Sequence, residues 1–168
     1  MDVRTAVSPK DAKYYTTDRL REEFLIQDLF VPGEIKFVYS HIDRIITGAA
    51  VPVKPIQLTA GEELRAEYFL ERREMGVINI GGKGMITIDG KLYTVDSREG
   101  MYIGMGSKDI VFASEDTKDP AKFYINSAPA HKTYKTVLIK TEGKAADDVV
   151  IVKDSNKNCI DKFFTNFF

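Results

Sequence analysis

The sequence is poor in the side chains that most often bind transition metals. Its 168 residues include two histidines, His41 and His131, and one cysteine, Cys159. A catalytic zinc site needs about three protein ligands, mostly histidine, cysteine or carboxylate. A single cysteine also excludes an intrachain disulfide framework, so a reducing cytoplasm is the expected setting. The sequence therefore predicts a cytoplasmic chain that ligates no metal.

Strong charge of one sign and long apolar runs are also missing. The 24 basic and 25 acidic residues give a net charge of −1, which offers no electrostatic case for nucleic acid or an anionic membrane as a partner. The longest weakly polar stretch, residues 45–53, is far shorter than the roughly 20 residues of a membrane-spanning helix. The first residues lack the apolar segment of a secretion signal. With 43% hydrophobic residues, the composition predicts a soluble domain with its own core.

Short strands separated by turn residues dominate the chain. The clearest is a hairpin in which residues 85–88 and 91–95 flank Asp89 and Gly90, the dipeptide that best supplies two positive φ angles. Further strands are predicted at residues 35–40, 77–80, 101–103, 110–113, 122–127 and 136–140. Many short strands at close spacing are typical of an antiparallel sandwich or barrel. We predict an all-β fold.

The two ends of the chain depart from this pattern. Residues 18–25 predict one short amphipathic helix, which Asp18 can cap. After residue 140 the sequence turns polar, which predicts a barrel over residues 1–140 and a connector over 141–168, with a possible strand at 149–152. Four phenylalanines within residues 163–168 predict either packing onto the sheet or an exposed apolar patch that marks a missing partner.

Residues 61–84 keep the frame of a metal-binding barrel motif without its histidines, with Gly61 one residue further upstream than the motif asks. The small barrels called cupins carry a first motif close to G-x5-H-x-H-x3-E-x6-G. Here Glu74 takes the acid position, while Tyr68 and Leu70 stand at the two histidine positions. In the second cupin motif, Asp109 stands at the histidine position. The chain thus resembles a cupin whose barrel holds no metal, because leucine is no ligand and neutral tyrosine a poor one.

His41 and Asp43 are candidates for a catalytic pair. On a strand their side chains share a face, and the carboxylate could orient the imidazole as a general base. A salt-bridge cluster at a strand end or subunit contact is the alternative. A third hypothesis is a metalloenzyme that uses His41, Asp43 and Asp109. His131 follows a strand into a proline-containing turn and is predicted to be a loop or interface histidine.

Residues 71–74, Glu-Arg-Arg-Glu, place four charges in succession. On a strand, alternation turns two of them inward unless the segment bends, and buried charges persist only when paired. An Arg72–Glu74 pair at the barrel mouth could bind the carboxylate of a sugar acid, because a guanidinium matches carboxylate geometry. A structural ion-pair network is the alternative.

Several long blocks carry a more specific resemblance. Residues 40–46, 68–81, 111–114, 120–124 and 128–131 resemble the 5-keto-4-deoxyuronate isomerase family, and the likeness runs from residue 1 to about residue 164. The resemblance implies a bicupin, two barrels in one chain, with zinc in the C-terminal barrel. It also implies a cytoplasmic homo-oligomer, usually a hexamer, that isomerises 4-deoxy-L-threo-5-hexosulose-uronate during bacterial pectin breakdown. Such a reaction needs a base and an electrophile, a role that zinc serves in the family.

No residue of this chain matches a family zinc ligand. The chain ends where the second barrel is expected to begin, so the resemblance implies an N-terminal part that is active only together with a zinc barrel. A metal-free sugar-acid binding or oligomer-assembly module is the alternative from another class.

Overall fold

The computed structural model describes residues 1–140. The predicted connector, the strand at 149–152, Cys159 and the phenylalanine cluster lie outside the described residues, so the predicted boundary after residue 140 stays a prediction. Strands make up most of the described chain. In chain order the elements are β1 (Asp2–Arg4), α1 (Pro9–Ala12), α2 (Thr17–Phe24), β2 (Ile35–Ser40), β3 (Ile46–Ala50), β4 (Ile56–Gln57), the 3-10 turn η1 (Glu62–Leu64), β5 (Arg73–Asn79), β6 (Gly84–Ile88), β7 (Lys91–Val95), β8 (Gly100–Ile103), β9 (Ile110–Ser114), β10 (Phe123–Pro129) and β11 (Val137–Ile139).

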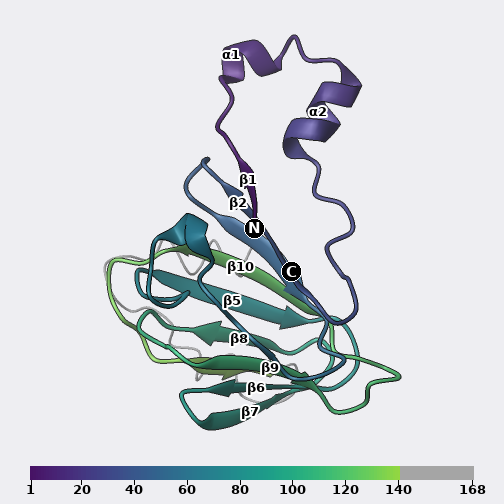
Figure 1. The fold of residues 1–168 in the computed structure, drawn as a ribbon, viewed down its shortest axis with the longest axis vertical. Coiled ribbons are helices and arrows are strands. Elements are labelled where there is room, and N and C mark those ends of the chain that lie inside the picture. Colours follow the sequence, from purple (N-terminus) through teal and green to yellow (C-terminus); the bar gives the residue numbers. More distant parts are fainter. Residues whose placement is uncertain (141–168) are drawn as a thin grey trace.

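The strands form two sheets. One has the order β1-β2-β3-β10-β5-β8-β11 and the other the order β4-β9-β6-β7. Neighbouring strands of the described chain run antiparallel, except that β1 lies parallel to β2. Figure 1 shows the sheets stacked, with α1 and α2 on an arm that extends away from them. This is the predicted all-β, cupin-like antiparallel sandwich.

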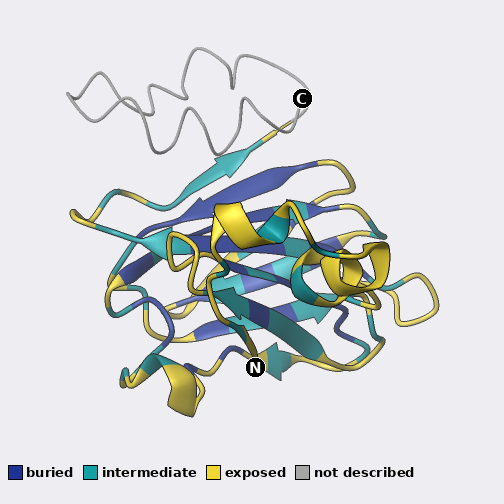
Figure 2. Cartoon of the chain, turned by 90° about the horizontal axis from the view of Figure 1, so that it is seen from above, coloured by how far each residue is buried: buried dark blue, intermediate teal, exposed yellow. Residues whose placement is uncertain are grey.

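The space between the sheets is filled by apolar side chains. Along β5, Met75 and Val77 are fully buried in this core, and Ile86 of β6 faces them from the other sheet. The rings of Phe112 and Phe123 lie 5.3 Å apart, one from each sheet. Figure 2 shows the buried residues gathered on the strands and the exposed ones on the arm and loops. These buried side chains form one contiguous apolar core between the sheets.

The predicted hairpin is confirmed. Asp89 has a φ of 49° and Gly90 a φ of 81°, the two positive values that a type I′ turn requires. Within residues 1–140 the other predicted strands are present. β2 has the predicted bounds, the others have shifted ends, and β5 begins four residues before the predicted residue 77. Three strands were not predicted. Of these, β3 has the sequence ITGAA, whose small residues carry little strand propensity and are held by neighbours on both sides.

The predicted helix is confirmed as α2, but its cap differs. Thr16 precedes the helix and its Oγ1 accepts a hydrogen bond from the Arg19 amide at 3.3 Å, while Asp18 lies within the first turn. Such a residue before the helix satisfies a free amide that the first turn cannot. A second single-turn helix, α1, was not predicted. No helix of residues 1–140 has the length and apolar character needed to cross a membrane.

Candidate functional site

Three of the four cupin ligand positions do not converge on one point. Leu70 is fully buried in the apolar core. Glu74 lies on the other face of the large sheet, where its Oε2 accepts a hydrogen bond from the Tyr102 hydroxyl at 2.7 Å. Asp109 is exposed, and its amide donates to the Asp89 carboxylate at 2.9 Å. Within residues 1–140 no three His, Cys, Asp or Glu side chains are grouped so that they could hold a metal ion. The donor set therefore does not fit zinc.

A bend before β5 causes this divergence. Residues 71–72 form the bend, and strand alternation then starts at Arg73. Arg73, Met75 and Val77 consequently point inward, and Glu74 points outward. The charged run thus turns one arginine, rather than a pair of charges, into the barrel.

The predicted Arg72–Glu74 pair is not formed. Arg72 keeps 64% of its side chain exposed and donates from Nη2 to the carbonyl oxygens of Leu64, at 3.3 Å, and Arg65, at 2.8 Å. The two charges belong to opposite sides of the bend, which explains why alternation failed as a guide. Whether either residue contacts a substrate stays a prediction.

Glu74 forms a polar cluster of its own on the outer sheet face. Burial raises the pKa of this carboxyl, and the hydrogen bond from Tyr102 and the nearby charge of His131 oppose that rise. His131 itself lies in an exposed bend after β10, as expected of a loop histidine. This contact between Glu74 and Tyr102 lies on the sheet face opposite the barrel core.

His41 and Asp43 do not share a strand face. β2 ends at Ser40, His41 lies in a bend, and Asp43 occupies a turn with a φ of 53°. The prediction from strand alternation was wrong because β2 ends at Ser40, before both residues. Both residues are exposed, and the His41 ring packs edge-on against Tyr39 at 5.4 Å. A catalytic role for either stays a prediction.

Arg73 is the unexpected charged residue at the barrel mouth. It is only 7% exposed. Its Nε donates to the Ser127 hydroxyl at 3.1 Å, and its Nη2 donates to the carbonyl oxygens of Ser127, at 2.8 Å, and Arg44, at 2.6 Å. Burial lowers the pKa of Arg73 to about 10, with the nearby Arg44 charge acting in the same direction and Tyr39 opposing it. The fold therefore holds a buried cation with neutral acceptors.

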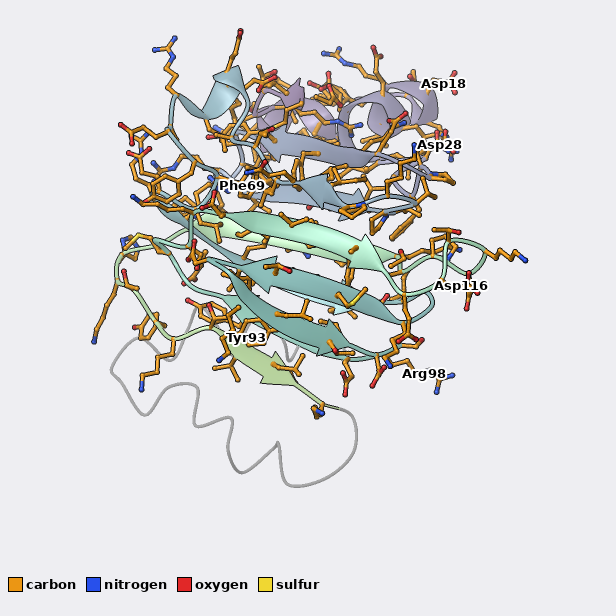
Figure 3. All side chains as sticks on the ribbon, turned by 60° about the horizontal axis from the view of Figure 1, so that its bottom comes forward. Asp18, Asp28, Phe69, Tyr93, Arg98 and Asp116 are labelled. Carbon is orange, nitrogen blue, oxygen red and sulfur yellow. The ribbon has the colours of Figure 1, made fainter. Side chains whose placement is uncertain are left out.

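A cavity of about 200 Å³ opens beside this arginine. It lies at the end of the sandwich where β5 begins, and Figure 3 shows Phe69 at that end with Arg98 at the opposite one. Two aromatic and three basic side chains dominate its walls. The lining residues are Tyr39, Arg44, Glu63, Leu64, Ala66, Phe69, Arg72, Arg73 and Pro129. The cavity is cationic, because its single acid faces three arginines.

The sequence contained a signal for this site that our prediction did not use. Met75 and Val77 are apolar positions two and four residues beyond Arg73. Strand alternation carried back from them places Arg73 on the core face. Tyr39 and Arg44 could not be added from sequence, because only the pairing of β2 and β3 brings them to the same end.

The fold and its apolar interior define the chain as an all-β, cupin-like domain. The family model described as KduI/IolB matches residues 24–163, and the chain belongs to that family. A relative from Lachnoclostridium phytofermentans, named 4-deoxy-L-threo-5-hexosulose-uronate ketol-isomerase, is 66% identical over 97% of this chain and 59% of its own length. A relative of the same name from Lachnospira eligens is 53% identical over 95% of this chain and 57% of its own length. The chain thus spans somewhat less than three fifths of these curated relatives.

Solved structures that resemble the chain include cupin proteins. A Bacteroides fragilis cupin protein aligns over 54% of this chain and 69% of its own, with a TM-score of 0.38 and 16% identity. The Clostridium difficile EutQ protein aligns over 58% of this chain and 62% of its own, with a TM-score of 0.39 and 22% identity.

Proposed function

We propose that this chain is the N-terminal barrel of a 4-deoxy-L-threo-5-hexosulose-uronate ketol-isomerase. The observation that carries the proposal is the 66% identity to a relative of that name over 97% of the chain. The proposed reaction converts 5-keto-4-deoxyuronate to 3-deoxy-D-glycero-2,5-hexodiulosonate in cytoplasmic uronate and pectin breakdown. The proposed assembly is a bicupin homo-oligomer, a hexamer as the resembled family implies.

The role of this barrel in the proposed enzyme is structural and substrate-facing. Ketol isomerisation moves a proton between adjacent carbons and needs a polarised carbonyl. Leu70 and the outward Glu74 supply no metal centre for that purpose, so the zinc of the proposed enzyme is held by residues other than those described. A catalytic role for His41 or Asp43, and a substrate contact by Arg72 or Glu74, remain hypotheses that variants of the assembled enzyme would test.

A chimera tests the proposal directly. The part of the L. phytofermentans relative that matches this chain is replaced by the chain itself, and isomerisation of 4-deoxy-L-threo-5-hexosulose-uronate is assayed. We expect a kcat/KM of the same order as that of the relative, because the two barrels share their core. The matched control is the 168-residue chain alone with zinc, which we expect to give no turnover.

Two results would reject the proposal. One is a chimera that folds and assembles like the relative yet is inactive. The other is turnover by the isolated chain at the rate of the relative, which would place the reaction within this polypeptide.

A further inference from the structure

The guanidinium of Arg73 has more N–H groups than its hydrogen bonds to residues 1–140 use. An arginine carries five N–H groups. The Nε–H and both hydrogens of Nη2 are used on Ser127 and on the Arg44 carbonyl. The structure gives Nη1 no acceptor among residues 1–140. The charge also has no carboxylate partner there, since none of the ion pairs of the described chain includes Arg73, and its guanidinium carbon lies 5.7 Å from the centre of the Tyr39 ring.

The other charged residues at the cavity do not offset the positive charge of Arg73. Arg44 lies close enough to disfavour the charged form of Arg73, and Arg72 lines the same cavity. The one acid, Glu63, has a lowered pKa because its own backbone N–H and the terminal amino group stabilise its carboxylate, and its Oε1 lies 3.2 Å from the Met1 nitrogen. Its charge is therefore already paired. Arg72 is likewise paired, since its Nε lies 3.9 Å from Glu71 Oε1. Arg73 and Arg44 belong to none of the ion pairs of the described chain, and an anion that enters the cavity stabilises these two like charges.

The aromatic lining and the volume of the cavity favour an organic anion over an inorganic one. Phe69, which is 2% exposed and whose ring stacks on Phe37 at 5.0 Å, lines the cavity together with Tyr39. Aromatic walls with a few convergent polar groups are typical of sites for small organic ligands. About 200 Å³ exceeds the volume of a bare inorganic anion and suits a carboxylate attached to a compact carbon skeleton.

We propose that this cavity is a binding site for the carboxylate of a monosaccharide acid, held by Arg73 and Arg44 at the barrel mouth. The Nη1 edge of Arg73 receives the carboxylate, since a planar guanidinium matches it in geometry, and the sugar ring lies against Tyr39 and Phe69. The choice of a uronate as the acid rests on the proposed function. The site itself rests on the cavity and its charges.

Calorimetric titration of the intact chain with D-galacturonate at low ionic strength tests the site. D-galactose is the neutral counterpart, and inorganic phosphate is the anion without a sugar. Of the three compounds, we expect only galacturonate to give a heat of binding. Added salt should weaken this binding, because the interaction is between charges. No heat at millimolar galacturonate overturns the proposal, as does equal affinity for galactose or phosphate.

Two matched arginine variants locate the binding. Arg44→Gln removes a cavity charge but keeps the backbone carbonyl that Arg73 uses, so the variant folds. Arg98→Gln removes the same charge from the far end of β5, and both arginines are exposed and have positive φ values, 54° and 69°. We expect Arg44→Gln to weaken galacturonate binding about tenfold, the value of a lost charge-assisted hydrogen bond, and Arg98→Gln to leave it unchanged. Equal binding by both variants overturns the proposal.

The binding-site proposal and the isomerase proposal are rejected by different results. Galacturonate binding by the chain together with an inactive chimera would reject the isomerase proposal and keep the site. An active chimera built on a chain that binds no galacturonate would reject the site and keep the isomerase proposal.

Discussion

Histidine at position 70 tests whether the barrel interior can become a metal site. Leu70 is fully buried in the apolar core. Leu70→His gives up apolar burial worth about 2 kcal/mol. It also buries an unpartnered imidazole at about 1–3 kcal/mol. The sum is about 3–5 kcal/mol, and since each kcal/mol moves Tm by about 2–4 °C in a domain of this size, we expect Tm to fall by about 6–20 °C.

Zinc should not rescue this variant. Thermal unfolding is measured with zinc or with EDTA for Leu70→His and for Tyr68→His/Leu70→His, which restores both motif histidines. Glu74 faces the other side of the sheet and Asp109 is exposed, so the two histidines find no third ligand, and we expect zinc to leave Tm unchanged. Met101→His, at an equally buried core position outside the motif, is the control and should lose similar stability.

A zinc-dependent rise in Tm for the double variant, absent from Met101→His, would refute this reasoning. It would mean that the ligand positions do converge. At a thousandfold excess over Kd such binding would add about 4 kcal/mol, enough to offset most of the expected loss. An unchanged Tm for Leu70→His without zinc would equally contradict the packed apolar interior.

Three further substitutions probe the same end of the barrel and its sheets. Ser127→Ala removes the hydroxyl that accepts from Arg73 Nε, so urea unfolding should show a loss of about 2 kcal/mol, and a negligible loss would deny that Arg73 depends on it. Glu74→Gln should be more stable than the original chain at pH 7. The raised pKa of Glu74 means that its protonation stabilises the fold below pH 4.5 and that this gain is lost as pH rises through the folded-state pKa, so the variant's advantage in Tm should shrink toward pH 4. Gly48→Ala would put a Cβ 2.1 Å from a ring carbon of Phe37, and we expect a loss of about 2–3 kcal/mol in the same unfolding assay, whereas tolerance would contradict this close packing.

The strands were predictable where local chemistry decides them. Asp89 and Gly90 fix their hairpin within a few residues, and its structure agrees with the sequence. Strand β3 was missed because its Ala and Gly residues become strand only through pairing with β2 and β10, which are far away in sequence. Local strand propensity does not include the effect of such distant partners, so it does not predict β3.

The candidate site, too, was predictable from the sequence only where local patterns decide its structure. The charged run at residues 71–74 was correctly singled out as unusual, and the bend within it was considered. The position of the bend decides that Arg73 enters the barrel while Arg72 stays in solvent, and no local pattern fixes that position. The neighbours of Arg73, Ser127 and the Arg44 carbonyl, arrive from more than 28 residues away through sheet pairing.

The central proposal is that the described barrel itself ligates no metal ion. The most direct test is the elemental zinc content of the intact chain, expressed with zinc and dialysed against metal-free buffer. The scattered ligand positions predict far less than one zinc ion per chain. One tightly held zinc ion per chain, lost in Tyr68→Ala or in Asp109→Ala, would contradict the claim.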